Sequence, residues 1–335
     1  MDPFRTIVEV QPSEKKITYS SALLFMGSCF SDAIGEKLES LKFQVSTNPF
    51  GVLFNPSSIA DNLRILMENK PFTPDRLYRY KGQWISFNHY TGYSHPDQKI
   101  CLEQINRSLA SSASHLKKAA FLFLTFGTAW VYRFNETGVI AANCHKLPSA
   151  SFTRFLLEPD EIIRTYNTLL QEIRNINPEL TVVFTLSPVR HWKDGAVNNQ
   201  KSKSILHYAI DTIADQNPGV HYFPAYEIFI DELRDYRFYG RDMLHPSESG
   251  VDYIWDRFLE TYMDAETLPL MKEVQSLIKT AGHRPVNPDD PSHQIFLQTS
   301  VAAMQRLSEM HPFLDFSPEI KKLEKQGIGS GDNFV

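Results

Sequence analysis

The pattern of apolar and polar residues predicts strands that alternate with helices over the first 262 residues. Short apolar runs have the length of buried strands at residues 23–26, 43–45, 120–125, 181–186 and 220–224. Between them, apolar residues recur every three or four positions, which predicts helices at residues 31–41, 57–68, 98–118, 159–175, 202–216 and 249–262. Buried strands that alternate with helices are typical of a parallel sheet covered on both faces. We therefore predict a three-layer α/β/α sandwich with a central parallel sheet as domain 1–262.

Two regions depart from this alternation. Residues 71–97 form an aromatic-rich insertion without a helical period, in which residues 84–90 alternate like a strand. Trp84, Ser86, Asn88 and Tyr90 would share one face of it, and aromatic rings mixed with amides suit the recognition of a sugar ring. Residues 263–335 have the pattern of a C-terminal helical extension, with a Gly- and Ser-containing tail that we expect to be flexible.

Composition narrows the class of protein. Among 335 residues, 42% are hydrophobic and 22% are charged, which is ordinary for a globular protein. The 34 basic and 39 acidic residues give a net charge of −5, which disfavours nucleic acid as a partner because phosphate contacts need a basic surplus. The apolar runs are shorter than the roughly 20 residues that a membrane helix needs, and no apolar signal-peptide core follows Met1. These two features predict a protein that does not bind membranes. The 3 cysteines are not spaced as a zinc site, so we expect a reduced, cytoplasmic protein.

The loops that follow the strands hold the candidate chemistry, because ligands bind at the carboxyl ends of parallel strands. Ser28 lies where the first strand turns into a helix. At such a turn a serine is exposed at the sheet edge, next to backbone N–H groups that stabilise a developing oxyanion. The alternative interpretation is that Ser28 only caps the helix.

Asp242 and His245 precede the last predicted helix of the sandwich. A carboxylate on one ring nitrogen fixes the histidine tautomer and leaves the other nitrogen free to accept a hydroxyl proton. A three-residue gap within a turn lets both side chains point the same way. The alternative is a surface aspartate paired with a solvated histidine.

These segments, in their order along the chain, resemble the SGNH/GDSL hydrolase superfamily, and most closely its GSCFA family. Residues 27–31 read Gly-Ser-Cys-Phe-Ser, and Ser31 replaces the final alanine of the GSCFA signature. Further similar segments are Asn-Pro-Phe-Gly at 48–51, Phe-Gly-Thr-Ala-Trp at 126–130, Asn-Cys-His-Lys at 143–146, Ser-Pro-Val-Arg-His at 187–191 and the turn at 242–245. The resemblance covers about residues 20–262.

The resemblance implies a role for each residue of a catalytic triad. Ser28 would be the nucleophile, His245 the general base and Asp242 the residue that orients the base. Backbone N–H groups of the Ser28 turn and of Gly51 would form the oxyanion hole.

The superfamily's third oxyanion donor is usually an asparagine in a Gly-x-Asn-Asp segment, and here that segment reads Gly127-Thr128-Ala129-Trp130. Asn143, Thr128 and the Trp130 indole are the alternative donors. One missing donor typically lowers turnover by about a hundred- to thousand-fold.

Other polar residues near the strand ends have less specific interpretations. We expect Trp130, Arg190 and His191 to contact a polar or anionic substrate group, with pairing to Asp194 as the alternative for Arg190 and His191. Cys29 is interpreted as a small buried residue, and Lys201 and Lys203 as a solvated helix start. The histidines lack metal-site spacing, so neither a metal nor another cofactor is expected.

The predicted function is therefore a serine-dependent ester hydrolase that acts through an acyl-enzyme. By analogy, its substrate would be a small molecule or carbohydrate that carries a short acyl ester. Two alternatives remain: an O-acyltransferase with the same catalytic residues, and a non-catalytic binding protein built on a hydrolase scaffold.

Overall fold

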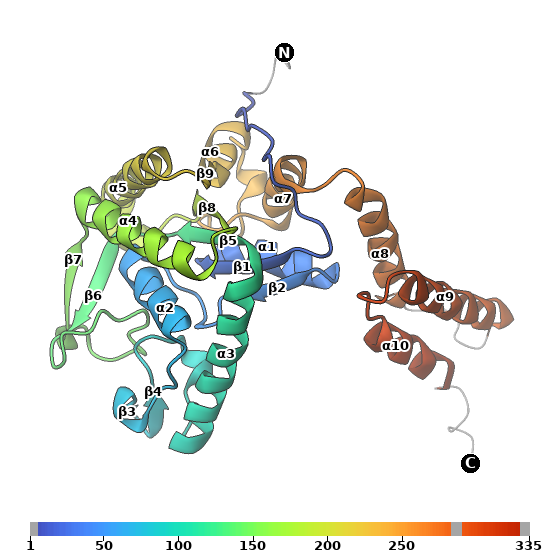
Figure 1. The fold of residues 1–335 in the computed structure, drawn as a ribbon, viewed down its shortest axis with the longest axis horizontal. Coiled ribbons are helices and arrows are strands. Elements are labelled where there is room, and N and C mark those ends of the chain that lie inside the picture. The colour runs from blue at the N-terminus through green and yellow to red at the C-terminus, as the bar shows by residue number, and fades with distance from the viewer. Residues whose placement is uncertain (1–5, 283–289, 329–335) are drawn as a thin grey trace.

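A parallel sheet of five strands forms the centre of the molecule, which is described by a computed structural model over residues 6–282 and 290–328. The spatial order of the strands is β2-β1-β5-β8-β9, and each neighbouring pair is parallel (Figure 1). Their bounds are Ala22–Gly27 for β1, Gln44–Thr47 for β2, Ala119–Phe126 for β5, Thr181–Leu186 for β8 and Val220–Phe223 for β9.

Helices cover both faces of this sheet, which confirms the predicted three-layer α/β/α sandwich. One face buries Leu24, Leu122 and Phe184 against four helices: α2 (Pro56–Glu68), α3 (Gln98–Lys118), α4 (Pro159–Ile176) and α5 (Gly195–Gln216). The other face buries Phe25, Phe123 and Val183 against α1 (Cys29–Ser40), α6 (Ala225–Glu227), the π-helical turn Ile228–Glu232 and α7 (Glu248–Tyr262). Alternate residues of each strand thus point to opposite layers, as the pleat requires.

Two antiparallel hairpins are added at the periphery. They are β3 (Tyr78–Tyr80) with β4 (Gln83–Ile85), and β6 (Trp130–Phe134) with β7 (Phe152–Leu156). Both contribute to a small apolar cluster that contains Phe87, Phe134 and Phe152. Short 3-10 turns lie at Pro74–Arg76, Thr91–Tyr93, Ser149–Ser151, Trp192–Asp194 and Tyr236–Phe238.

The predicted strand over residues 84–90 is wrong beyond Ile85. The chain instead turns at Ser86, whose carbonyl accepts a hydrogen bond from His89 N–H at 3.0 Å and whose hydroxyl lies 2.9 Å from His89 Nδ1. Because His89 is buried among aromatic rings, a local side-chain bond replaces the strand ladder.

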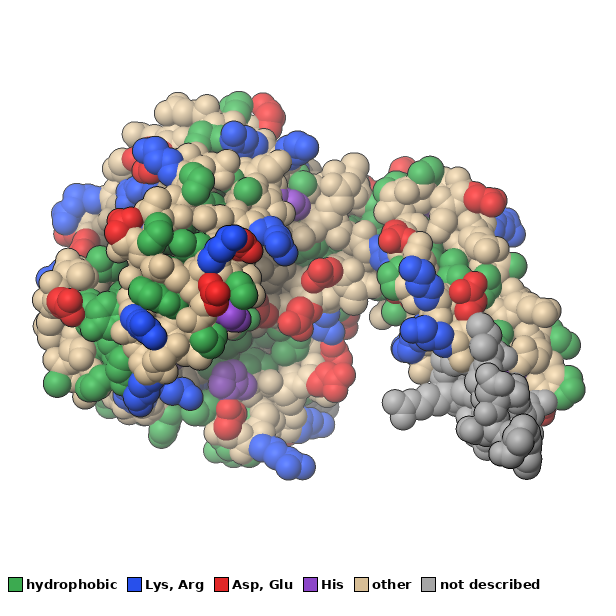
Figure 2. All heavy atoms as spheres, turned by 90° about the horizontal axis from the view of Figure 1, so that it is seen from below, with side chains coloured by type: hydrophobic (Ala, Val, Ile, Leu, Met, Phe, Trp, Pro, Cys, Tyr) green, Lys and Arg blue, Asp and Glu red, His purple; other side chains and the backbone are tan. Residues whose placement is uncertain are grey.

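The C-terminal helical extension is confirmed as α8 (Thr267–Gly282), α9 (Pro291–Met310) and α10 (Ser317–Ile328), which extend to one side of the sheet (Figure 1). Lys42 links the two parts, since its Nζ lies 2.9 Å from Glu319 and above the ring of Phe316. Tyr19 adds a ring contact with Phe313. The boundary at residue 262 stays a prediction, and the tail predicted to be flexible lies almost entirely outside the described residues. Figure 2 shows basic and acidic side chains interspersed over one face of both parts.

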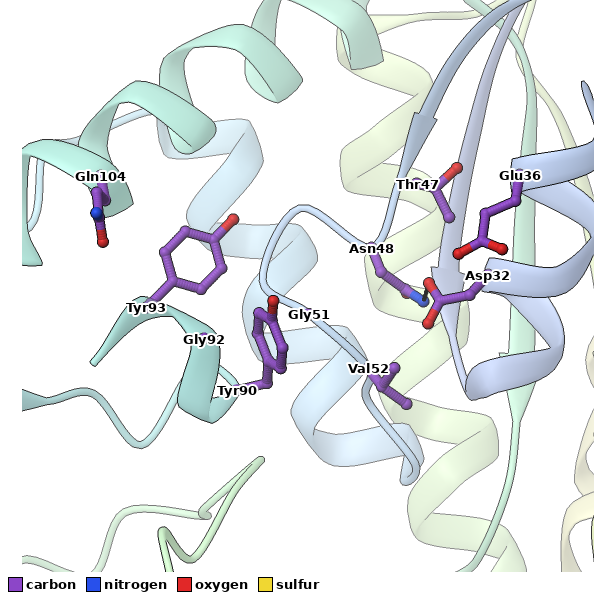
Figure 3. A pocket seen from close by; sticks show the side chains of 10 residues that line it. All are labelled: Asp32, Glu36, Thr47, Asn48, Gly51, Val52, Tyr90, Gly92, Tyr93 and Gln104. Atoms are coloured by element: carbon purple, nitrogen blue, oxygen red, sulfur yellow. Dashed lines mark hydrogen bonds between the residues drawn. The ribbon is translucent and has the colours of Figure 1, made fainter. Parts of the chain in front are cut away.

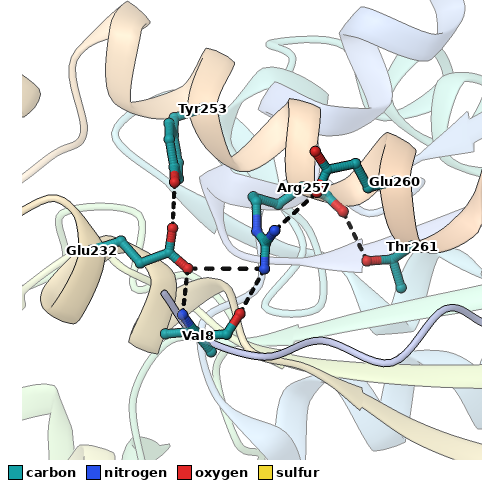
Figure 4. A network of polar contacts seen from close by, with 6 residues as sticks. All are labelled: Val8, Glu232, Tyr253, Arg257, Glu260 and Thr261. Carbon is teal, nitrogen blue, oxygen red and sulfur yellow. Dashed lines mark hydrogen bonds and ion pairs between the residues drawn. The ribbon is translucent and has the colours of Figure 1, made fainter. Parts of the chain in front are cut away.

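The N-terminal segment is fastened to α7 by a polar network (Figure 4). Val8 N–H donates to Glu232 Oε1 at 2.7 Å, and Arg257 Nη2 donates to Val8 O at 2.6 Å. Glu232 is also bonded by the Tyr253 hydroxyl and lies 3.9 Å from Arg257. The buried carboxylate is therefore both paired with a cation and hydrogen-bonded, which is what a buried charge requires.

Gly27 ends β1 in a conformation that excludes a side chain. Its φ is +143°, and a Cβ at this position would lie 2.2 Å from the carbonyl oxygen of Thr125 on β5. The two strands pair at these residues, so neither backbone can withdraw without breaking the sheet.

We predict that Gly27→Ala lowers the free energy of unfolding by about 3 kcal/mol or more, because strained backbone and a steric clash combine. Gly138→Ala is the matched control, since Gly138 also has positive φ but faces open space. Gly138→Ala should lower the free energy of unfolding by only about 1–2 kcal/mol. Urea unfolding of both variants measures the difference, and equal losses would contradict this role of Gly27.

Candidate functional site

Ser28 follows Gly27 and begins α1. Its backbone N–H donates to Thr125 O at 3.2 Å, and its Oγ accepts a hydrogen bond from Phe30 N–H at 3.3 Å. The residue is only 1% exposed. The structure therefore shows the capping role that the sequence left open, with the hydroxyl at the N-terminal end of the helix dipole.

Asn48 holds the turn that carries Ser28 in place. Its Oδ1 accepts from Gly27 N–H at 2.8 Å, and its Nδ2 donates to Asp32 Oδ1 at 2.6 Å. The loop after β2 thereby joins the end of β1 to the first turns of α1. Gly51, predicted to lend an oxyanion N–H, donates that N–H to Asn48 O at 2.7 Å.

Asp242 and His245 form the predicted pair, with 2.6 Å between Asp242 Oδ2 and His245 Nδ1. The other carboxylate oxygen, Oδ1, accepts from the backbone N–H groups of Leu244 and His245 at 2.9 and 3.0 Å. These bonds, chiefly that from His245 N–H, lower the pKa of Asp242 well below its usual range. The side chains are 48% and 51% exposed, so the pair lies at the surface.

The structure brings the Asp242–His245 turn to the end of β8 but does not join it to Ser28. Arg190 N–H, in the loop after β8, lies 3.4 Å from Leu244 O. Within the described residues, no hydrogen bond connects Ser28 with His245. The nucleophile of the implied triad follows β1 and its base adjoins the loop after β8, with β5 between these two strands in the sheet.

The residues expected to contact substrate lie around the ends of β5 and β8. His191 N–H donates to Asn199 Oδ1 at 2.8 Å, and a Cβ on Gly127 would lie 3.2 Å from His191 Nε2. Burial, followed by the charge of Lys203, lowers the pKa of His191 to about 4, so its imidazole is neutral at neutral pH. His191 therefore offers a neutral ring at the strand ends.

All three residues expected to contact substrate have a buried side-chain nitrogen without a hydrogen-bond partner among the described residues. These atoms are Trp130 Nε1, Arg190 Nε and His191 Nε2. Asp194 pairs instead with Arg154, which also stacks on Trp130, and among the described residues no ion pair joins Asp194 to Arg190 or His191.

Neither of the two remaining candidate oxyanion donors has a hydrogen bond to Ser28 within the described residues. Asn143 Oδ1 accepts from His145 N–H at 2.8 Å within its own turn, in the segment after β6. Thr128 Oγ1 lies 3.1 Å from Ser202 Oγ and accepts from Trp130 N–H at 3.2 Å.

Lys203 is not part of a solvated helix start, and that prediction is wrong. It is 1% exposed, and its Nζ donates to Ser187 O, at the end of β8, at 2.6 Å. Helix α5 begins at Gly195 rather than at 202, so Ser202 and Lys203 lie on its buried face. Ser202 Oγ accepts from Ala129 N–H at 2.8 Å, so α5 holds the loops after both β5 and β8.

The sequence held a signal for this arrangement. Leu206 and Ile210 are buried on α5, and continuing their spacing backwards by three or four residues reaches Asn199, Ser202 and Lys203. Lys201, which is out of register with that face, is exposed as expected.

Cys29 is partly buried, and burial raises the pKa of its thiol, which keeps it protonated and a poor nucleophile. Among residues 6–282 and 290–328, no cluster of three or more His, Cys, Asp or Glu is arranged to hold a metal ion. Over the same residues, no helix has both the length and the apolar character needed to cross a membrane.

Fold and site together define an α/β/α sandwich with a Gly-Ser turn after a central strand and an Asp-His pair before the last helix of the sheet domain. The chain belongs to the GSCFA family, whose family model matches residues 22–258. The C-terminal domain of GSCFA domain proteins matches residues 274–327, within α8 to α10.

Two of the solved structures that resemble this chain show how distant the likeness is. A Streptococcus pneumonia protein provisionally assigned as a platelet activating factor is 13% identical, with a TM-score of 0.38 over 75% of this chain and 83% of that chain. The acetyl xylan esterase Est2A from Butyrivibrio proteoclasticus is 11% identical, with a TM-score of 0.37 over 73% of this chain and 64% of that chain. No curated protein matches the chain.

The buried amine of Lys203 predicts a pH-dependent stability. Burial, and next the charge of Arg190, lower the pKa of Lys203 from 10.5 to about 7. Between these pH values the unfolded chain binds a proton that the folded chain does not, so stability rises with pH across this window and the effect levels off below pH 7.

We predict that the free energy of unfolding of the native protein, relative to Lys203→Met, rises by roughly 1 kcal/mol per pH unit between pH 7.5 and 9.5. Urea unfolding over this range measures it. Lys201→Met, which removes an exposed lysine of the same helix, is the control and should show no such slope. A flat difference for Lys203→Met would show that the folded amine keeps an ordinary pKa.

Proposed function

We propose that this protein is a serine-dependent ester hydrolase that forms an acyl-enzyme on Ser28. The observation that carries the proposal is the 2.6 Å contact between Asp242 and His245, on a turn that touches the loop after β8. Ser28 follows β1, which β5 separates from β8 in the same sheet, and caps the N-terminus of α1. Acyl transfer uses these three residue types in these roles.

In the proposed reaction, Ser28 Oγ attacks the ester carbonyl carbon and His245 Nε2 takes the hydroxyl proton. Asp242 Oδ2 accepts from His245 Nδ1–H, which keeps Nε2 unprotonated beforehand and stabilises the imidazolium afterwards. The tetrahedral intermediate collapses, the alcohol leaves with the proton from His245, and the acyl group stays on Ser28. Water, activated by His245 in the same way, then releases the acid.

This chemistry requires His245 to come within hydrogen-bond reach of Ser28. We propose that it does so when substrate binds, because catalytic contacts often tighten only then. Ser28 Oγ would then exchange its 3.3 Å bond from Phe30 N–H for one to the imidazole. Helix N–H groups that have no earlier carbonyl to bond face the developing oxyanion.

Ser28 is buried, and a short acyl group reaches a buried hydroxyl more readily than a large one does. We therefore propose an acetyl-sized group as the acyl part, carried by a carbohydrate. An acceptor sugar in place of water would make the same site a transferase.

The first prediction concerns the nucleophile. A fluorophosphonate probe, which reacts with activated serines, should label the native protein and fail to label Ser28→Ala, with hydrolysis of short aryl esters lost in parallel. Losing one cap bond costs about 1 kcal/mol, so the variant should stay folded.

Ser31→Ala is the matched control, because Ser31 is equally buried, donates to Thr125 Oγ1 at 2.7 Å and stands where the GSCFA signature has alanine. It should keep labelling and activity. A folded native protein that the probe leaves unlabelled, and that cleaves no ester, would indicate a non-catalytic binding protein.

The second prediction concerns the Asp242–His245 pair. Asp242→Asn and His245→Ala should each lower kcat by roughly a thousand-fold or more, by analogy with other triads. The double variant should be hardly slower than His245→Ala, because the two residues act as one unit.

Steady-state kinetics on aryl esters tests this, with Asp231→Asn, an exposed carboxylate that pairs with Arg234, as control. A loss of only a few-fold in Asp242→Asn, or losses that multiply in the double variant, would rule out this relay.

A further inference from the structure

A cleft of about 480 Å³ lies beside the Ser28 turn (Figure 3). Its walls come from α1, the loop after β2, the turn that contains Tyr90 and Tyr93, and α3. The lining residues are Asp32, Glu36, Thr47, Asn48, Gly51, Val52, Tyr90, Gly92, Tyr93 and Gln104. Ser28, Asp242 and His245 are not among them, but Asn48, which lines the cleft, bonds the N–H of Gly27 next to Ser28.

Tyr90 is an exposed ring held in a fixed position. A Cβ on Gly51 or on Gly92 would lie 2.1 or 2.2 Å from atoms of the ring, so only glycines leave room for it. Tyr90 N–H donates to Phe50 O at 2.9 Å, and the ring meets Tyr93 edge-on at 5.7 Å between centroids. Although 45% exposed, Tyr90 is therefore preorganised, which lowers the entropy cost of binding a ligand on its face.

Tyr93 is anchored as well. Its hydroxyl lies 2.7 Å from Pro49 O and 2.8 Å from Ser108 Oγ, within hydrogen-bond distance of both. The turn that carries both tyrosines is thus tied to the loop after β2 and to α3, so the aromatic wall keeps its place relative to the opposite wall.

The opposite wall is acidic. Asp32 and Glu36 lie one turn apart on α1 and face the tyrosines across the loop that carries Gly51 (Figure 3). Gln104 adds an amide from α3 on the side of Tyr93 (Figure 3). None of the ten described lining residues is Lys or Arg. Burial, with the neighbouring Glu36 as a further cause, raises the pKa of Asp32, in keeping with excess negative charge here. Such a cleft repels anions and offers hydrogen bonds to hydroxyl groups.

We propose that this cleft binds a neutral sugar ring, with its C–H face on Tyr90 and its hydroxyls hydrogen-bonded to Asp32, Glu36 and Gln104. The slightly positive C–H groups of a sugar pack favourably on the negative face of an aromatic ring. Planar carboxylate and amide groups then fix the orientation of the hydroxyls.

That this sugar is the substrate of the esterase rests on the proposed function. Asn48 supplies the connection, since it bonds both Gly27 N–H and Asp32. A sugar seated in the cleft would therefore lie next to the turn that presents Ser28, with its acyl group on the side of that turn.

Isothermal titration calorimetry on the full chain carrying Ser28→Ala, which prevents turnover, tests the cleft directly. The probes are two neutral oligosaccharides, cellohexaose and xylohexaose, and one anionic oligosaccharide, hexagalacturonate. We expect at least one neutral probe to bind, and hexagalacturonate to bind at least ten-fold more weakly.

Tyr90→Ala should weaken binding of the neutral probe at least ten-fold, whereas Tyr90→Phe, which keeps the ring, should stay within about two-fold. Tyr236→Ala removes a more exposed tyrosine outside the cleft and should change nothing.

Failure of both neutral probes to bind at millimolar concentration would overturn the proposal, as would unchanged affinity in Tyr90→Ala or equal affinity for hexagalacturonate. The serine probe separates this outcome from that of the proposed function. Binding through Tyr90 without labelling of Ser28 would keep the cleft and refute the esterase, and labelling without binding would do the reverse.

Discussion

The contact of Gly27 with the backbone of Thr125 is the constraint on which the rest of the site depends. It sets β1 against β5 at the carboxyl edge of the sheet, and only glycine leaves space for it. Gly27 N–H is taken by Asn48 and Gly27 O by Leu53 N–H, so the same residue also fixes the loop after β2. Ser28 follows directly, and its position is therefore determined by the contacts of Gly27 with Thr125, Asn48 and Leu53 rather than by its own side chain.

Helix α5 plays the corresponding role on the other half of the sheet. Ser202 binds the loop after β5, and Lys203 binds the end of β8. A buried amine is costly to keep charged, and here it lies next to Arg190, another cation. The carboxyl ends of β5 and β8 thus carry Arg190, Lys203 and several hydrogen-bond donors, whereas the cleft near β2 is lined, among the described residues, by two carboxylates and by no Lys or Arg. A ligand that spans this edge of the sheet would therefore meet different chemical groups at its two ends.

Much of this fold could be predicted from the sequence, because buried strands and amphipathic helices have different apolar periods. Helix 98–118 and strand 181–186 agree with the observed α3 and β8 at both ends. The hairpin of β6 and β7 was not predicted, since its short strands mix exposed and buried residues and derive their order from packing on Phe87. Proximity of Asp242 to His245 followed from their spacing. The burial of Lys203 was missed because the helix was predicted to begin at residue 202, although the spacing of Leu206 and Ile210 puts Lys203 on the buried face of α5.

The network around Glu232 also bears on how the chain is made. Val8 is held by Arg257, 249 positions later, and Ile17 bridges to Met263. A ribosome that adds roughly 5–20 residues per second needs on the order of 10–50 s to reach that point. Once β5 has been made, the first strand has both of its neighbours to pair with, but the segment before it has no anchor until Glu232 and Arg257 follow. Final closure of the sheet domain therefore waits for its last helix, and a nascent chain that stops short of α7 would present that N-terminal segment to chaperones and proteases.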